Sequence, residues 1–150
     1  MKKFKFTLDR MLSFKNQILD KEKDLLGQIR HQKIQLEQTI ERYHLKQTEL
    51  SKEMTEAQRQ GTTVLKLRGY SIQIENIHHG IKQLKKELVA IDAEVERQTD
   101  VVRKASQEVS SLEKLQERQW EQFLYEEKKR TEDEVLEFVT GRLVREGNFQ

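Results

Sequence analysis

Apolar side chains recur along almost the whole chain at alternating intervals of three and four residues. This spacing keeps them on one narrow side of a helix, so that two helices can wind around each other. The first series consists of Leu8, Leu12, Leu19, Leu26, Ile29, Leu36, Ile40, Tyr43, Leu50, Met54 and Ala57. The second consists of Leu67, Tyr70, Ile74, Ile77, Ile81, Leu84, Leu88, Ile91, Val95, Val102, Ala105, Val109, Leu112 and Phe123. The pattern therefore predicts two long coiled-coil helices.

A short interruption, residues 60–63, separates the two series. Gly61 suits the left-handed residue just past a helix end, and the hydroxyl of Thr62 or Thr63 can cap the next helix. We therefore expect an all-α fold in which two long helices form an antiparallel coiled-coil hairpin. Residues 1–150 form a single domain in this prediction, with a helix over about 5–59, a turn over about 60–63 and a helix over about 64–145.

Folding the chain back about this turn keeps the two apolar series in step along their length. Two polar positions of the first series then gain neighbours of opposite charge. Lys33 is expected beside Asp92, and Glu22 beside Arg103. Gly69 and Gly80 lie within the second helix. They are either tolerated within a long coiled coil, or they loosen the turn end and allow a partner to approach closely.

Composition excludes several classes of protein. Hydrophobic residues make up 35% and charged residues 36% of the chain, which suits a two-helix structure better than a globular core. The net charge is +2, too small to indicate nucleic-acid binding, and there is no cysteine for a disulfide or thiolate metal site. The chain has no apolar run of roughly 18 residues. Its basic start lacks the apolar region of a secretory signal. We therefore expect a cytoplasmic protein.

Surplus apolar side chains gather where the two termini are expected to meet. Folding about the turn places residue 4 opposite residue 120. The first helix contributes Phe4, Phe6, Met11, Ile18 and Leu25, and the second contributes Trp120, Leu124, Leu136 and Phe138. Three explanations are open: the termini pack on each other, the ends are frayed, or this end docks another protein, since exposed apolar area of this kind usually marks an interface.

No catalytic, cofactor-binding or metal-ligating motif is expected. His78 and His79 are adjacent, so on a helix they point in different directions and do not hold one ion together. No glycine-rich phosphate loop follows a strand pattern. Lys2, Lys3 and Lys5 could contact anionic lipid or an acidic partner, but three lysines provide weak affinity. The sequence therefore predicts a binding protein and not an enzyme.

Three stretches of the chain resemble the flagellar export protein FliJ family. They are residues 4–12, residues 61–70 followed by Ile77 and Ile81, and the C-terminal segments 112–118 and 123–128 with Asp133 and Glu134. The resemblance implies a non-enzymatic, stalk-like component of the flagellar type III protein export apparatus. It implies no cofactor. The alternatives are the equivalent stalk of an injectisome or a homodimeric coiled-coil scaffold.

Partners follow from this resemblance. It implies binding to the hexameric export ATPase, to the export-gate membrane protein and to export chaperones, at the cytoplasmic side of the cell membrane. The end where the termini meet is expected in the ATPase ring, through Phe4, Phe6, Met11, Ile18, Leu25, Trp120, Leu124, Glu127, Asp133, Glu134, Leu136 and Phe138. The region after the turn is expected at the export gate, through Tyr70, Gln73 and Ile77.

Overall fold

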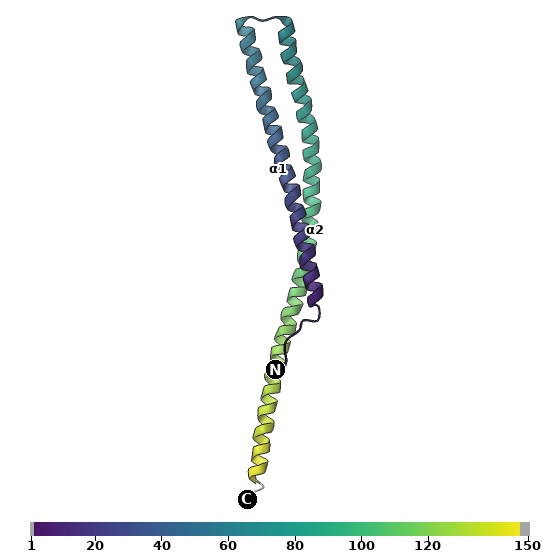
Figure 1. The fold of residues 1–150 in the computed structure, drawn as a ribbon, viewed down its shortest axis with the longest axis vertical. Helices are drawn as coiled ribbons and strands as arrows, with labels where there is room; N and C mark the ends of the chain where they lie inside the picture. The colour runs from purple at the N-terminus through teal and green to yellow at the C-terminus, as the bar shows by residue number, and fades with distance from the viewer. Residues whose placement is uncertain (1, 148–150) are drawn as a thin grey trace. The chain divides into compact units, whose positions relative to one another are not determined.

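A computed structural model describes residues 2–147, and all of its regular structure is helical (Figure 1). Helix α1 spans Asp9–Gln60 and helix α2 spans Val64–Gly147. The chain divides into two compact units. The turn unit is Asp20–Arg103; the terminal unit lies within Met1–Leu19 and Lys104–Gln150. In each unit a segment of α1 runs antiparallel to a segment of α2. The predicted all-α class and hairpin arrangement are therefore confirmed.

Helix α1 begins later than the sequence pattern predicts. It starts at Asp9, not near residue 5, so that expectation was wrong. The backbone N–H of Asp9 bonds the carbonyl of Phe6 at 3.2 Å in a turn, and the first helical bond runs from the N–H of Leu12 to the carbonyl of Leu8 at 2.9 Å. Asp9 then lies in the first turn, where a carboxylate favours the positive end of the helix dipole. The preceding residues leave the helix because their aromatic rings pack on α2.

The turn between the helices uses the residues that its geometry requires (Figure 1). Gly61 has a φ of 89°, a left-handed conformation that costs little only for glycine. The Oγ1 of Thr63 accepts a hydrogen bond from the backbone N–H of Lys66 at 3.2 Å. Of the two threonines that could cap α2, Thr63 does so. This cap satisfies one of the donors left unpaired at a helix start.

The core of each unit is a narrow apolar seam between the two helices. Its buried side chains come from the two predicted series. In the turn unit they are Leu26, Ile29, Ile40, Leu50 and Ile81; in the terminal unit they are Leu12, Leu19 and Val109, joined by Phe6. One stripe per helix is enough to bury this core, so most of the remaining surface is free to be charged.

The ion pair expected between Lys33 and Asp92 is present at 2.8 Å. The hydrogen bond from Lys33 to Asp92 is the larger cause, and the negative charge of Asp92 the next, of a raised pKa at Lys33, above the ordinary value of 10.5. Burial acts in the opposite direction. A raised folded-state pKa means that the pair stabilises the fold at neutral pH. This contribution is lost only as the pH rises through that pKa.

The sequence pattern predicted Glu22 beside Arg103, but these two residues do not form an ion pair. The backbone carbonyl of Glu22 accepts a hydrogen bond from the Nε2 of Gln98 at 3.1 Å, and its carboxylate accepts another from the same nitrogen. Arg103 pairs instead with Asp100 on its own helix at 3.0 Å. The amide of Gln98 is buried in the seam, where leaving it unpaired would cost more than leaving the exposed Arg103 in water.

Gly80 permits a close approach within the chain, and not the approach of a partner. A Cβ at this position would lie 2.9 Å from the Cε2 atom of Tyr43. Distances this short do not occur between real carbon atoms, so the ring would have to move. A Cβ on Gly69 would meet nothing within 4 Å. The two helical glycines therefore differ: Gly80 makes room for the Tyr43 ring, whereas Gly69 does not serve packing.

These contacts give a matched pair of glycine substitutions. We expect Gly69→Ala to raise the free energy of unfolding by about 1 kcal/mol, the difference in helix propensity. Gly80→Ala should give no such increase in the free energy of unfolding, because the new methyl group displaces the Tyr43 ring. In a Tyr43→Ala background, Gly80→Ala should recover this increase. Urea unfolding of the four variants measures this coupling; equal gains from both glycines in the unaltered chain would contradict it.

The seam itself is tested by a buried and an exposed isoleucine of α1. Ile40 is buried, whereas Ile34 is exposed. We expect Ile40→Asp to lower the free energy of unfolding by several kcal/mol, because it buries a carboxylate without a partner. Ile34→Asp should change it by less than about 1 kcal/mol, as surface substitutions do. Thermal melts followed by circular dichroism distinguish the two, and equal melting temperatures would show that Ile40 is not core.

Candidate functional site

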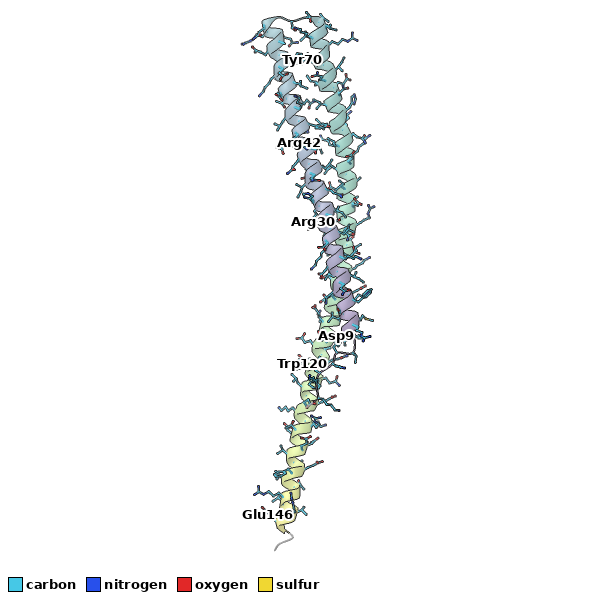
Figure 2. All side chains as sticks on the ribbon, viewed as in Figure 1. Asp9, Arg30, Arg42, Tyr70, Trp120 and Glu146 are labelled. Atoms are coloured by element: carbon cyan, nitrogen blue, oxygen red, sulfur yellow. The ribbon has the colours of Figure 1, made fainter. Side chains whose placement is uncertain are left out.

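An aromatic cluster of Phe4, Trp120 and Phe123 anchors the N-terminal segment in the terminal unit. The Phe4 ring lies edge-on to Trp120, with centroids 5.1 Å apart, and 5.5 Å from Phe123. The Trp120 and Phe123 rings are stacked at 5.8 Å. Figure 2 shows Trp120 level with the chain segment that precedes Asp9. The contact between positions 4 and 120 is the one that folding about the turn predicts.

Phe6 and Thr7 complete this attachment. The Phe6 side chain is buried, and the Oγ1 of Thr7 accepts a long hydrogen bond of 3.4 Å from the Nε2 of Gln119. Phe6 is thus part of the core of the terminal unit, and its ring is not available to a partner. The N-terminal segment therefore packs on α2 at Trp120 and Phe123, which is part of what the first of the three explanations held, and most apolar residues beyond Phe123 remain exposed.

Beyond Phe123 the coiled-coil series of α2 stops being apolar. Its next positions are Glu126, Arg130, Asp133 and Glu137. The apolar residues of this segment lie elsewhere on the helix. At about 100° per residue, they centre on the side roughly opposite the seam. We call them the terminal face: Trp120, Leu124, Tyr125, Val135, Leu136, Phe138, Val139 and Leu143, each at least 43% exposed.

Apart from Trp120, whose ring contacts Phe4, the side chains of the terminal face are exposed along α2. A shallow groove runs along this face, lined by Thr131, Glu132, Val135, Leu136 and Val139. Because its residues point away from the seam, α1 cannot cover them by extending further along α2. Eight large apolar side chains on one exposed stretch are more than scattered surface residues account for. Such a patch is typical of a protein-binding surface.

Three of the predicted site residues are carboxylates in the same helical segment as the terminal face, and they differ in exposure and in their ion pairs. Glu127 is half-buried and forms a 2.7 Å ion pair with Arg130, which also lies 3.9 Å from Glu134. Asp133 is exposed and forms no ion pair with the residues that the structure describes. Arg130 therefore partly neutralises two of the three predicted carboxylates. Asp133 is the one without an ion pair among the described residues, but it occupies a position of the coiled-coil series, on the side of α2 opposite the terminal face.

The predicted site residues on α1 fall into different environments. Met11 is exposed and Ile18 is half-buried, both in the terminal unit. Leu25 is exposed but belongs to the turn unit. Phe14 is more exposed than Met11 and was not among the predicted contacts. The terminal unit thus contains eleven of the twelve predicted residues, all except Leu25, but they do not form one continuous surface, since Phe6 is buried and Asp133 lies opposite the terminal face.

The residues predicted to meet an export gate lie in the turn unit. Tyr70 and Ile77 are half-buried at the seam, and Gln73 is exposed between them. Figure 2 places Tyr70 close to the turn. Only Gln73 of the three offers a fully accessible side chain, so this set presents little surface to a partner.

Among residues 2–147, no group of three His, Cys, Asp or Glu side chains comes together that could hold a metal ion. Within the same range, neither helix has a stretch apolar and long enough to pass through a bilayer. Of the exposed large apolar residues among those that the structure describes, the terminal face holds the largest group.

Comparison with known families identifies the chain's relatives. The model of the family described as Flagellar FliJ protein matches residues 4–147, so the chain belongs to this family. It is therefore a component of the flagellar protein export apparatus, as the sequence resemblance implied. No curated protein matches the chain, and no solved structure does.

The aromatic cluster can be tested through the chain's single tryptophan. We expect Phe4→Ala to shift the Trp120 emission to longer wavelength, because removal of the ring admits water to the indole. The far-ultraviolet circular dichroism should be unchanged, since Phe4 precedes α1. Phe14→Ala is the control: Phe14 is exposed and forms no aromatic pair within residues 2–147. An unchanged emission in Phe4→Ala would mean that the N-terminal segment does not pack on Trp120.

Proposed function

We propose that this FliJ family member is a non-enzymatic, stalk-like adaptor that binds the hexameric export ATPase ring through its terminal unit. The terminal face carries this proposal, because it groups eight exposed large apolar side chains of the described chain and it points away from the chain's own seam. A ring of subunits offers a central opening into which a single helix with exposed apolar residues fits. The helical segment beyond Phe123 has that form.

A few side chains of the terminal face are expected to supply most of the binding energy. Interface energy is concentrated in aromatic and aliphatic anchors, each worth about 2 kcal/mol or more when truncated. Leu124 and Phe138 suit this role because they project from one side of α2 and are exposed. Asp133 would add mainly to the rate of association with a basic ring surface.

The turn unit is left for the remaining partners. We assign the export-gate membrane protein to the region that follows the turn, with Gln73 as the accessible member of the predicted set. Export chaperones would bind the same protein. This arrangement places the chain in the cytoplasm, held at the membrane through its partners. It is supported by family membership and by the position of the terminal face, which leaves the turn region unused by the ATPase.

The test compares two double variants for binding and stimulation of the purified export ATPase. We expect Leu124→Ala/Phe138→Ala to weaken co-assembly by more than about tenfold, because two interface anchors are lost. Both side chains are exposed, so helicity and melting temperature should be retained. Tyr70→Ala/Gln73→Ala should bind the ATPase as the unaltered chain does.

Val89→Ala is a matched control, since Val89 is exposed on α2 in the turn unit and lies outside both predicted sites. If Tyr70→Ala/Gln73→Ala loses ATPase binding while Leu124→Ala/Phe138→Ala keeps it, the assignment of the two ends is reversed.

A further inference from the structure

A second exposed surface lies on the first turns of α2, directly after the chain reversal. We call it the tip patch: Val64, Leu65, Arg68 and Ile72. Val64 is 82% exposed and Leu65 is 80% exposed, the two largest values among the exposed large apolar residues of the described chain. Ile72 is half exposed. None of these residues belongs to the predicted export-gate set.

The tip patch lies on the outer side of α2. Positions 64, 68 and 72 follow one another at the spacing of a helical turn, and Leu65 lies beside Val64. The seam positions of the same segment, Leu67, Tyr70 and Ile74, point to the other side and are half-buried against α1. The tip patch is therefore exposed even though the two helices pack normally, because α1 covers the opposite side of α2.

Basic side chains predominate around the tip patch, although Glu75, three residues after Ile72, lies on the same side of α2. Residues 57–74 contain Arg59, Lys66 and Arg68 and no acidic side chain. Arg59 forms a 3.1 Å ion pair with Glu56 on its own helix. Lys66 and Arg68 form no ion pair with any residue that the structure describes. Val64, Leu65 and Arg68 thus project from one side of α2, whereas Lys66 belongs to the same helical turn but lies nearer the seam.

We propose that the tip patch binds the surface of an anionic lipid bilayer. Val64 and Leu65 enter the headgroup region, and Lys66 and Arg68 contact lipid phosphates with their charged ends while their methylene groups remain among apolar atoms. The shape favours lipid over a second protein copy. A stable protein interface buries roughly 800 Å² on each partner, more than a few side chains at the end of a hairpin supply. A bilayer surface accepts a small projecting patch of this composition.

This interaction is separate from ATPase binding, because it uses residues of the turn unit only. The test is co-sedimentation of the full chain with vesicles, in two compositions: pure phosphatidylcholine, and phosphatidylcholine with phosphatidylglycerol. We expect binding to the anionic vesicles, little binding to the neutral ones, and loss of binding at high salt. Val64→Ser/Leu65→Ser and Lys66→Gln/Arg68→Gln should each reduce binding to anionic vesicles by about tenfold or more.

Val89→Ser is the matched control, as an exposed valine of the same helix outside the tip patch. Circular dichroism should show equal helicity in all variants. The proposal is overturned if the chain does not bind anionic vesicles. If, in that case, the tip variants lose binding to the purified export-gate protein, the tip patch is a protein-binding surface instead. The proposal is also overturned if the tip variants bind vesicles as well as the unaltered chain, which would assign the binding to Lys2, Lys3 and Lys5.

Discussion

Burial of one narrow apolar seam by a second copy of the same pattern is the constraint on which this structure depends. With 36% charged residues, the chain has no apolar surface for a globular core, and each helix can bury only one stripe. A polar side chain at a seam position therefore needs a hydrogen-bonding or ion-pairing partner on the opposite helix. Lys33 finds Asp92, and the amide of Gln98 finds Glu22. The partly buried pair of Gln98 and Glu22 also disfavours shifted registers, because any slip leaves the amide of Gln98 without a partner.

The sequence pattern identified the helices, the turn and the packing direction because these depend on local spacing and on few residue types. Gly61 and Thr63 are readable in the same way, since a left-handed residue and a helix cap have strong chemical preferences. The residue at which α1 starts could not be predicted from the sequence pattern. Residues 5–8 could have continued the helix, and only the packing of Phe4 and Phe6 on α2 removes them from it. The contact between Gly80 and Tyr43 was missed for the same reason: it depends on the distance between two helices and not on the spacing along one of them.

The candidate site was predictable in outline and not in detail. Surplus apolar residues near the termini were visible in the sequence, but their division between core and surface was not. Phe6 is buried, whereas Leu124 and Phe138 are exposed. The distinction depends on where the apolar series of α2 ends. After Phe123 its positions become charged, and apolar residues move to the other side of the helix. That change of side separates residues that hold the chain together from residues that are available to a partner.

Exposed apolar residues carry a risk of aggregation, so their distribution in a protein with one seam is informative. A two-helix protein has no cavity to enclose a ligand, and its partners must bind outer faces. Both uncovered patches, the terminal face and the tip patch, lie on the side of α2 that turns away from α1. The charged residues of the two segments differ: acidic residues outnumber basic ones between residues 124 and 143, whereas residues 57–74 contain Arg59, Lys66 and Arg68 and no acidic residue. A basic partner therefore suits the terminal face and an anionic one suits the tip patch. Because like charges disfavour the wrong pairing, this difference can direct each partner to its own site without any contribution from shape.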